Sequence, residues 1–415
     1  MKGLRILISF AIALSFLAAL SIFFGDQQVR AANAGGAPPP NAPALEPLPE
    51  ALPPNCTEGT QASGALYRIC RPIIPGAHDD LVLYAHGFVE PDAPLAIPTE
   101  AEAIATYVNL QGYAFATTSY RMNGLAIRPG MEDLQELIDI YTGKYGTPYR
   151  VILMGFSEGG IITALSVEEY PEIYAGGLAM CGPYGDFQEQ VNYFAGFRAV
   201  FDYYFPNLLP GSAISVPQSL IDNWETTFDT QILPVISNPA NAVSVTNLLA
   251  VTGAPTDADQ ITQTIHNALW YQVHTTTDGI SKLGGQPFDN SEKVYSGSSD
   301  DAALNAGVIR YTADLTPTQT IANLYETDGL LERPIVLMHT NRDEIVPYWH
   351  QTLYKQKSTN GENPNLMYTY TINRYGHCNF TQNEIITAFG KLIQMIDNPP
   401  APPPAATIYL PLVTR

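Results

Sequence analysis

A glycine-x-serine-x-glycine motif at residues 155–159 places a candidate nucleophile at Ser157. The apolar residues 151–154 before it are typical of a buried strand, and residues 161–170 after it are typical of a helix. A sharp strand-to-helix turn holds its central residue in strained backbone geometry, and the flanking glycines let neighbouring backbone pass close by. We therefore expect the serine hydroxyl to stand exposed at the carboxyl end of the strand. The amide of Glu158, at the helix N-terminus, would be ready to stabilise an oxyanion.

A serine hydroxyl is a poor nucleophile near neutral pH, so it needs a base and an acid that orients the base. Catalytic groups in open parallel sheets collect at the carboxyl ends of strands. His377 and Asp343 each follow directly after a predicted strand, and we assign them as base and acid. Glu344, and more distantly Asp328, are the rivals of Asp343. The chain order serine, aspartate, histidine is the order that such a triad takes in an α/β sheet enzyme.

The elements that must position these residues alternate between strands and helices. The expected strands cover residues 81–85, 113–119, 151–154, 175–181, 334–338 and 366–373. The expected helices cover residues 101–110, 131–145, 161–170, 348–357 and 381–396. This alternation predicts an α/β fold, with a mostly parallel central sheet and helices on both faces.

A long, mainly helical and aromatic-rich segment at residues 183–332 interrupts this alternation. We expect it to be a lid or cap inserted over the carboxyl edge of the sheet, with the sheet-forming core at residues 55–182 and 333–397. Its aromatic side chains are expected to form an internal core more often than a substrate wall.

Four motifs in this order resemble the α/β-hydrolase superfamily. They are His86-Gly87-Phe88, the glycine-rich turn around Ser157, the run Asp343-Glu-Ile-Val-Pro347, and Gly376-His377. The resemblance covers residues 66–182 and 333–397, and the Asp-x-x-Val-Pro run favours Asp343 as the acid. In that superfamily, the residue after His-Gly and the residue after the serine supply the oxyanion amides. The resemblance therefore implies that Phe88 and Glu158 supply them here.

Cys378, next to His377, resembles the cysteine that adjoins the catalytic histidine in feruloyl esterases and tannases. Those enzymes pair it with a cysteine beside the serine, whereas Phe156 and Glu158 flank the serine here. The chain also resembles peptidases of the prolyl-oligopeptidase type, which use the same triad and often a comparable cap.

The composition restricts the partners of the protein. The chain has 415 residues, 46% of them hydrophobic, which is enough for a full core plus an insertion. Forty acidic residues against 20 basic ones give a formal charge of −20, so neither nucleic acid nor an anionic lipid surface is an expected partner. The sequence has no His-Glu-x-x-His, Cys-x-x-Cys, calcium-loop or Gly-x-Gly-x-x-Gly pattern, so we expect no metal and no cofactor.

The two ends of the chain predict an exported protein. Residues 1–34 have a positively charged start, a long uncharged apolar run and a small-residue cleavage pattern, as in a secretory signal peptide. An uncleaved N-terminal membrane anchor is the alternative, because the apolar run is long for a signal. Residues 35–54 form a linker rich in Pro and Ala, and residues 398–415 form a Pro-rich linker with an apolar tail. That tail resembles those of some secreted bacterial proteins, and it either attaches the protein to the cell surface or docks on the domain as a strand.

Four cysteines in an exported chain are candidates for disulfides. Cys56 and Cys70 flank a short segment suited to a hairpin, and we expect them to pair. Cys181 and Cys378 both fall near the carboxyl edge of the predicted sheet, where they either form a bridge or stay as two buried thiols.

The sequence therefore predicts a secreted serine hydrolase, a carboxylesterase or lipase, that cleaves small ester substrates through an acyl-enzyme. The alternative is an exported serine peptidase of the prolyl-oligopeptidase or aminopeptidase type, in which Glu90, Glu225 or Asp229 would receive a free amine. A third hypothesis is a non-catalytic binding protein with the same fold.

Overall fold

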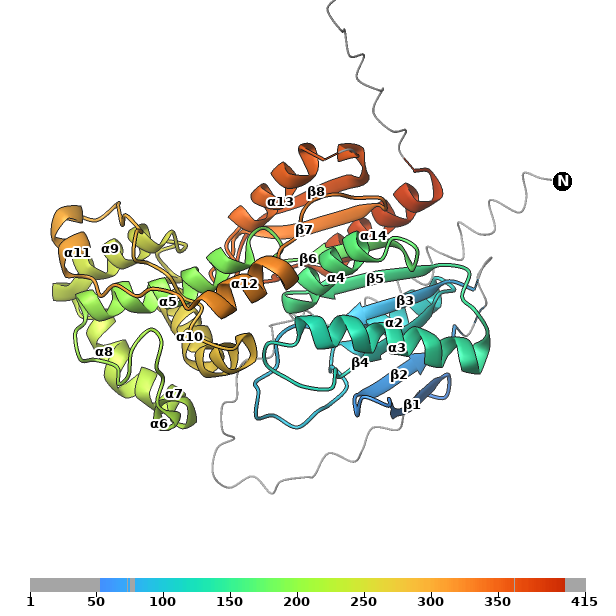
Figure 1. The fold of residues 1–415 in the computed structure, drawn as a ribbon, viewed down its shortest axis with the longest axis horizontal. Coiled ribbons are helices and arrows are strands. Elements are labelled where there is room, and N and C mark those ends of the chain that lie inside the picture. Colours follow the sequence, from blue (N-terminus) through green and yellow to red (C-terminus); the bar gives the residue numbers. More distant parts are fainter. Residues whose placement is uncertain (1–52, 73, 75–78, 362, 400–415) are drawn as a thin grey trace, which may run out of the picture.

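The computed structural model of the chain describes residues 53–72, 74, 79–361 and 363–399 (Figure 1). The expected signal peptide, the C-terminal tail from residue 400 and nearly all of the expected linker at 35–54 lie outside these residues. Among the described residues, none of the helices combines the length and the apolar composition that crossing a membrane requires.

The centre of the molecule is an eight-stranded sheet in the order β1-β2-β4-β3-β5-β6-β7-β8. Strand β2 runs antiparallel to both its neighbours, and β3 to β8 are mutually parallel. The mostly parallel sheet that the sequence predicts is thus confirmed. The strands are β1 Cys56–Thr60, β2 Leu66–Cys70, β3 Leu81–Ala85, β4 Ala114–Thr118, β5 Val151–Phe156, β6 Tyr174–Met180, β7 Ile335–Arg342 and β8 Met367–Tyr375.

Helices cover both faces of the sheet (Figure 1). Apolar residues of α3, α4 and α13 pack on one face, and those of α2 and α14 pack on the other. Side chains of β3 alternate between the two faces of the sheet. Leu81 and Leu83 pack in the core on the first face, and Val82 and Tyr84 pack in the core on the second. These helices are α2 Ala101–Leu110, α3 Ile127–Tyr145, α4 Glu158–Glu169, α13 Trp349–Thr359 and α14 Gln382–Asp397.

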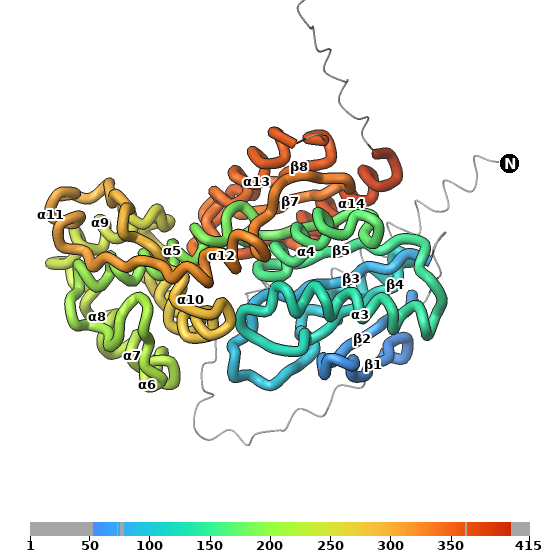
Figure 2. The backbone as a smooth tube through the Cα atoms, viewed as in Figure 1, coloured from blue at the N-terminus to red at the C-terminus, as the bar shows by residue number. Residues whose placement is uncertain are grey.

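The chain between β6 and β7 forms a helical insertion that extends to one side of the sheet (Figure 2). Its aromatic residues Phe197, Phe201, Phe205 and Trp224 are buried in a hydrophobic core of the insertion's own. The insertion comprises α5 Phe187–Tyr204, α6 Gln218–Asp222, α7 Trp224–Thr227, the π-helix η1 Phe228–Ile232, α8 Leu233–Ile236, the 3-10 helix η2 Pro239–Asn241, α9 Ala242–Thr252, α10 Ile261–Leu283, α11 Asp301–Gly307 and α12 Leu315–Leu324.

Helix α10 connects the insertion to the carboxyl edge of the sheet at several points. It contacts the end of β8, the loop after β7 and the loop after β4, so it lies across the strands between them. Its polar contacts are Thr264 Oγ1 with Tyr375 Oη at 3.0 Å, Asn267 Nδ2 donating to Glu344 Oε1 at 2.7 Å, and Leu125 N donating to Asp278 Oδ2 at 2.7 Å.

Two disulfides cross-link the core. Cys56 and Cys70 are opposite each other in the β1–β2 hairpin, as the sequence predicts, and they are bonded. Cys181, which follows β6, is bonded to Cys378 in the loop after β8. The sequence left that second pairing open, because the distance between the two cysteines depends on how β6, β7 and β8 assemble.

The second disulfide is expected to stabilise the fold more than the first. Cross-linking reduces the entropy of the unfolded chain more as the loop grows. The first disulfide spans 14 positions and the second spans 197. Replacing Cys56 and Cys70 by serine should therefore lower the free energy of unfolding by about 3 kcal/mol, and replacing Cys181 and Cys378 by about 5 kcal/mol. Urea unfolding of both double variants measures this; a smaller loss for the second pair would contradict the loop-entropy account.

Candidate active site

Ser157 lies in a strained turn between β5 and α4. Its φ is +56°, a left-handed conformation that is unfavourable for a residue with a side chain. A Cβ added to Gly155 would lie 2.2 Å from the carbonyl oxygen of Gly159, and one added to Gly159 would lie 2.0 Å from that of Ala85. Both glycines are therefore required by the close approach of backbone, and the turn holds the serine hydroxyl at the carboxyl end of β5.

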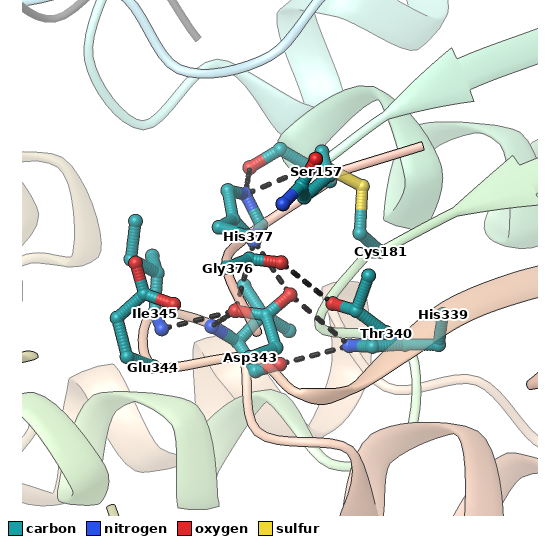
Figure 3. A network of polar contacts seen from close by, with 12 residues as sticks. Ser157, Cys181, His339, Thr340, Asp343, Glu344, Ile345, Gly376 and His377 are labelled. Atoms are coloured by element: carbon teal, nitrogen blue, oxygen red, sulfur yellow. Dashed lines mark hydrogen bonds and ion pairs between the residues drawn. A yellow bond between two sulfur atoms is a disulfide. The ribbon is translucent and has the colours of Figure 1, made fainter. Parts of the chain in front are cut away.

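His377 lies within hydrogen-bond distance of Ser157. Its Nε2 is 2.9 Å from Ser157 Oγ, and its Nδ1 is 2.8 Å from Asp343 Oδ2 (Figure 3). The loop that carries the imidazole is fixed by Thr340 of β7, whose Oγ1 donates to the carbonyl oxygen of Gly376 at 2.7 Å. The three residues that the sequence assigns as nucleophile, base and acid thus form one continuous hydrogen-bonded line.

Asp343 is buried and held by several donors at once. Its Oδ1 accepts hydrogen bonds from the backbone amides of Ile345 and Val346, at 3.0 and 2.8 Å. A second histidine, His339, places its Nε2 3.5 Å from Oδ2 (Figure 3). Burial by itself would raise the pKa of Asp343, but the charge of His377 and the hydrogen bonds outweigh it and hold the pKa well below its usual range. Asp343 is therefore an anion at neutral pH, as an acid that orients an imidazolium must be.

The rival acids make other contacts. The Oε1 of Glu344 accepts a hydrogen bond from Asn267 of α10, and no bond joins its carboxylate to His377 among the described contacts. Burial and the nearby charge of Asp343 raise the pKa of Glu344 to about 7. Asp328 lies after α12, where its carboxylate accepts from the amide of Leu330 at 2.7 Å. The structure thus brings Asp343, and not these two, to the histidine.

The backbone expected to supply the oxyanion amides runs beside Ser157. A Cβ added to Gly87 would lie 3.2 Å from the Cβ of Ser157, so the loop that leads into Phe88 passes against the serine. Glu158 is the first residue of α4. The first backbone amides of a helix have no acceptor within it, and they lie at the positive end of the helix dipole. His86 has a structural place in this loop, because it is buried and stacks on Tyr120 with ring centroids 3.9 Å apart.

The side chain of Glu158 belongs to the site in a way that the sequence did not indicate. It is buried, and its Oε1 accepts a hydrogen bond from the amide of Ala126 at 2.7 Å, one residue before α3. Burial raises the pKa of Glu158 to about 8, although that hydrogen bond and the charge of Lys282 act in the opposite direction. The carboxyl group is therefore mainly protonated at neutral pH and adds little negative charge beside the serine.

The disulfide between Cys181 and Cys378 is in direct contact with His377. Cys378 Sγ is 3.4 Å from His377 Nε2, and the bond joins the histidine loop to the end of β6, next to β5 (Figure 3). Cys181 and Cys378 both have positive φ, at 45° and 50°. The bridge thus restrains the loop on which the imidazole depends. No cysteine adjoins the serine in the sequence, and the partner of Cys378, Cys181, follows the strand β6 that neighbours β5.

A mainly apolar cavity opens at Ser157. The volume of its empty space, with the part that is open to solvent included, is about 950 Å³. Helices α5 and α10 of the insertion form much of its wall, and the core contributes Phe88, Ile345 and Val346. Phe194 and Tyr271 stack face to face in this wall, with ring centroids 5.4 Å apart. Some insertion aromatics therefore line the cavity while others form the internal core.

The charge on Asp343 has a consequence for the pH dependence of activity. Burial by itself would lower the pKa of His377, but the charge of Asp343 and its hydrogen bond outweigh burial, so the pKa is raised above its usual value. A general base must be neutral, and the imidazole is protonated below its pKa. We therefore expect kcat/KM to rise with pH through a midpoint above about 6.5. In Asp343→Asn this midpoint should shift down; a midpoint unchanged by that substitution would contradict the assignment.

Comparison with solved structures finds chains with a similar arrangement at low sequence identity. An esterase from Pyrococcus furiosus is 13% identical with a TM-score of 0.43, and the match covers 82% of this chain and 90% of the esterase. A Staphylococcus aureus protein of unknown function has the same identity and score, with 82% and 98% covered. An acylaminoacyl peptidase from Pyrococcus horikoshii is 11% identical with a TM-score of 0.39, with 82% and 41% covered. No protein-family model and no curated protein sequence matches the chain.

The chain has an α/β-hydrolase fold. The strand order, the strained serine between β5 and α4, and the loops after β7 and β8 that carry Asp343 and His377 are those of that fold. The resemblance that the motifs indicate is thus confirmed at the level of the fold. What the chain acts on has to be inferred from its own side chains.

Proposed function

We propose that the protein is an exported serine hydrolase that cleaves carboxylic esters through an acyl-enzyme intermediate. The observation that carries the proposal is the line of hydrogen bonds from Asp343 through His377 to Ser157, at 2.8 and 2.9 Å. A hydroxyl in contact with a buried imidazole, which is itself held by an anionic carboxylate, is an activated nucleophile. The two disulfides fit the oxidising environment in which an exported protein would fold and function.

In the first half of the proposed reaction, Ser157 Oγ attacks the ester carbonyl carbon while His377 Nε2 accepts the hydroxyl proton. The tetrahedral oxyanion is stabilised by the amides of Phe88 and Glu158. Asp343 holds the imidazole in the required tautomer and stabilises the positive charge that forms on it. The intermediate then collapses, the alcohol leaves with the proton from His377, and the acyl group remains on the serine.

In the second half, His377 accepts a proton from a water molecule, and the resulting hydroxide attacks the acyl-enzyme. A second oxyanion forms and collapses, which breaks the bond to Ser157 Oγ. The serine regains its proton from His377, and the carboxylic acid is released.

A serine peptidase would use the same three side chains, so the substrate decides between the two activities. The carboxylates named for a free amine, Glu90, Glu225 and Asp229, are not among the residues that line the cavity. Instead, Oε2 of Glu225 lies 3.2 Å from Nε2 of His266. We therefore expect turnover of p-nitrophenyl esters and none of aminoacyl-p-nitroanilides in parallel assays. Faster turnover of the anilides would favour the peptidase.

A further inference from the structure

The cavity at Ser157 has a shape and a charge that restrict its substrates. Five residues of α5 line it, at positions 187, 190, 191, 194 and 195, which is one face of a helix. At a rise of about 1.5 Å per residue, that face is about 12 Å long. Helix α10 packs against α5 and lines the cavity from Tyr271 to Leu283. The cavity therefore continues well beyond the space that a carbonyl group at Ser157 would occupy.

The charges in the wall do not suit an ionic substrate. Among the residues that line the cavity there is no Lys, Arg or His, and its two carboxyl groups are Glu158 and Asp278. Asp278 is neutralised by Lys282 at 2.9 Å and accepts a hydrogen bond from Leu125 N at 2.7 Å. An anionic group entering the cavity would lose its water without gaining a counter-ion, and a cationic group would meet an acid already paired.

One position in the wall is conspicuously small. Gly279 lies within α10 and lines the cavity, and a Cβ added to it would meet no heavy atom within 4 Å. Glycine weakens a helix, and the backbone of Gly279 does not have a positive φ that would require it. The backbone conformation therefore does not explain the glycine. Its missing side chain leaves additional space in the cavity.

We propose that the cavity binds an extended, uncharged, apolar arm of the ester substrate between α5 and α10, and that Gly279 determines how long this arm can be. The inference rests on the proposed esterase function and names its substrate class. The arm is either the acyl chain or the alcohol chain of the ester, since both are apolar chains attached to the same carbonyl group.

Two substrate series on the wild-type protein provide the first test. One series is p-nitrophenyl acetate, butyrate, octanoate and laurate, and the other consists of acetates of alcohols of the same chain lengths. Each methylene that is buried in an apolar pocket should improve kcat/KM by about fourfold. We therefore expect kcat/KM to rise with length in one series, which identifies the arm. A profile that is flat or falls from acetate onward in both series would overturn the proposal. The monoester of succinic acid should react at least about tenfold more slowly than the butyrate ester.

Substitution of Gly279 provides the second test. Gly279→Phe should lower kcat/KM for the longest substrate at least about tenfold more than it lowers kcat/KM for acetate. Gly143→Phe is the matched control, because Gly143 is an exposed glycine of α3 whose Cβ would also meet nothing within 4 Å. Ala195→Trp, on α5, tests the opposite wall. An unchanged ratio of long to short substrates in both cavity variants would overturn the proposal.

Failure of this inference and failure of the proposed function give different results. If only the inference is wrong, acetate is hydrolysed and a fluorophosphonate still labels Ser157, but the length profile is flat or falls. If the proposed function is wrong, neither series is hydrolysed and the label is absent.

Discussion

Replacing Ser157 by alanine is expected to lower kcat for ester hydrolysis on the order of 10⁶-fold. The hydroxyl is the only side-chain group in the proposed reaction that forms a bond to the acyl carbon, and the oxyanion amides alone leave a small residual rate. The substitution removes one oxygen atom from a turn whose geometry is set by Gly155 and Gly159, so the fold should survive.

The measurement is steady-state hydrolysis of p-nitrophenyl butyrate, together with thermal unfolding of the variant. Ser237→Ala is the matched control, because that serine is exposed on the insertion and should leave the rate unchanged. A folded Ser157→Ala variant that kept an appreciable part of the wild-type rate would refute the assignment of the nucleophile.

Replacing Asp343 by asparagine is expected to lower kcat about 10⁴-fold. An amide in this position can still accept hydrogen bonds from the amides of Ile345 and Val346, so the loop is maintained. It cannot stabilise the imidazolium of His377 as a carboxylate does, and it favours the wrong tautomer of the imidazole. The loss should therefore fall on kcat more than on KM.

Glu344 offers a control with the same acid-to-amide substitution at the neighbouring position. Its Oε1 accepts from Asn267, a bond that the amide oxygen of glutamine can keep. We expect Glu344→Gln to cost less than about tenfold in kcat, which corresponds to about 1.4 kcal/mol. A larger loss in Glu344→Gln than in Asp343→Asn would show that Glu344, and not Asp343, is the acid that orients His377.

The parts of the fold that depend on local pattern could be predicted from the sequence. The strand before Ser157 and the helix after it follow from a run of apolar residues and a glycine-rich turn, and β5 and α4 agree with them. Strand β7 extends to Arg342, beyond the apolar residues that predicted it, because its polar end pairs with β8, as Thr340 does with Ile372. Backbone pairing with a distant strand leaves no trace in hydrophobicity.

Contacts between distant segments explain what could not be predicted. Helix α3 begins at Ile127, four residues before its apolar pattern is clear. The amides of Leu125 and Ala126 just before it donate to Asp278 of α10 and Glu158 of α4, two acceptors far away in the sequence. The cavity depends in the same way on how α5 and α10 pack together. Periodicity indicates which helices are amphipathic but not which ones will face each other.

The most direct test of the central claim is reaction of the wild-type protein with a fluorophosphonate, followed by mass analysis of its peptides. The account predicts one covalent adduct on Ser157, formed faster as His377 loses its proton, and absent from Ser157→Ala. Slow labelling in Asp343→Asn would be consistent with this, because the base would be poorly oriented. No adduct on the folded wild-type protein, or an adduct on a different serine, would contradict it.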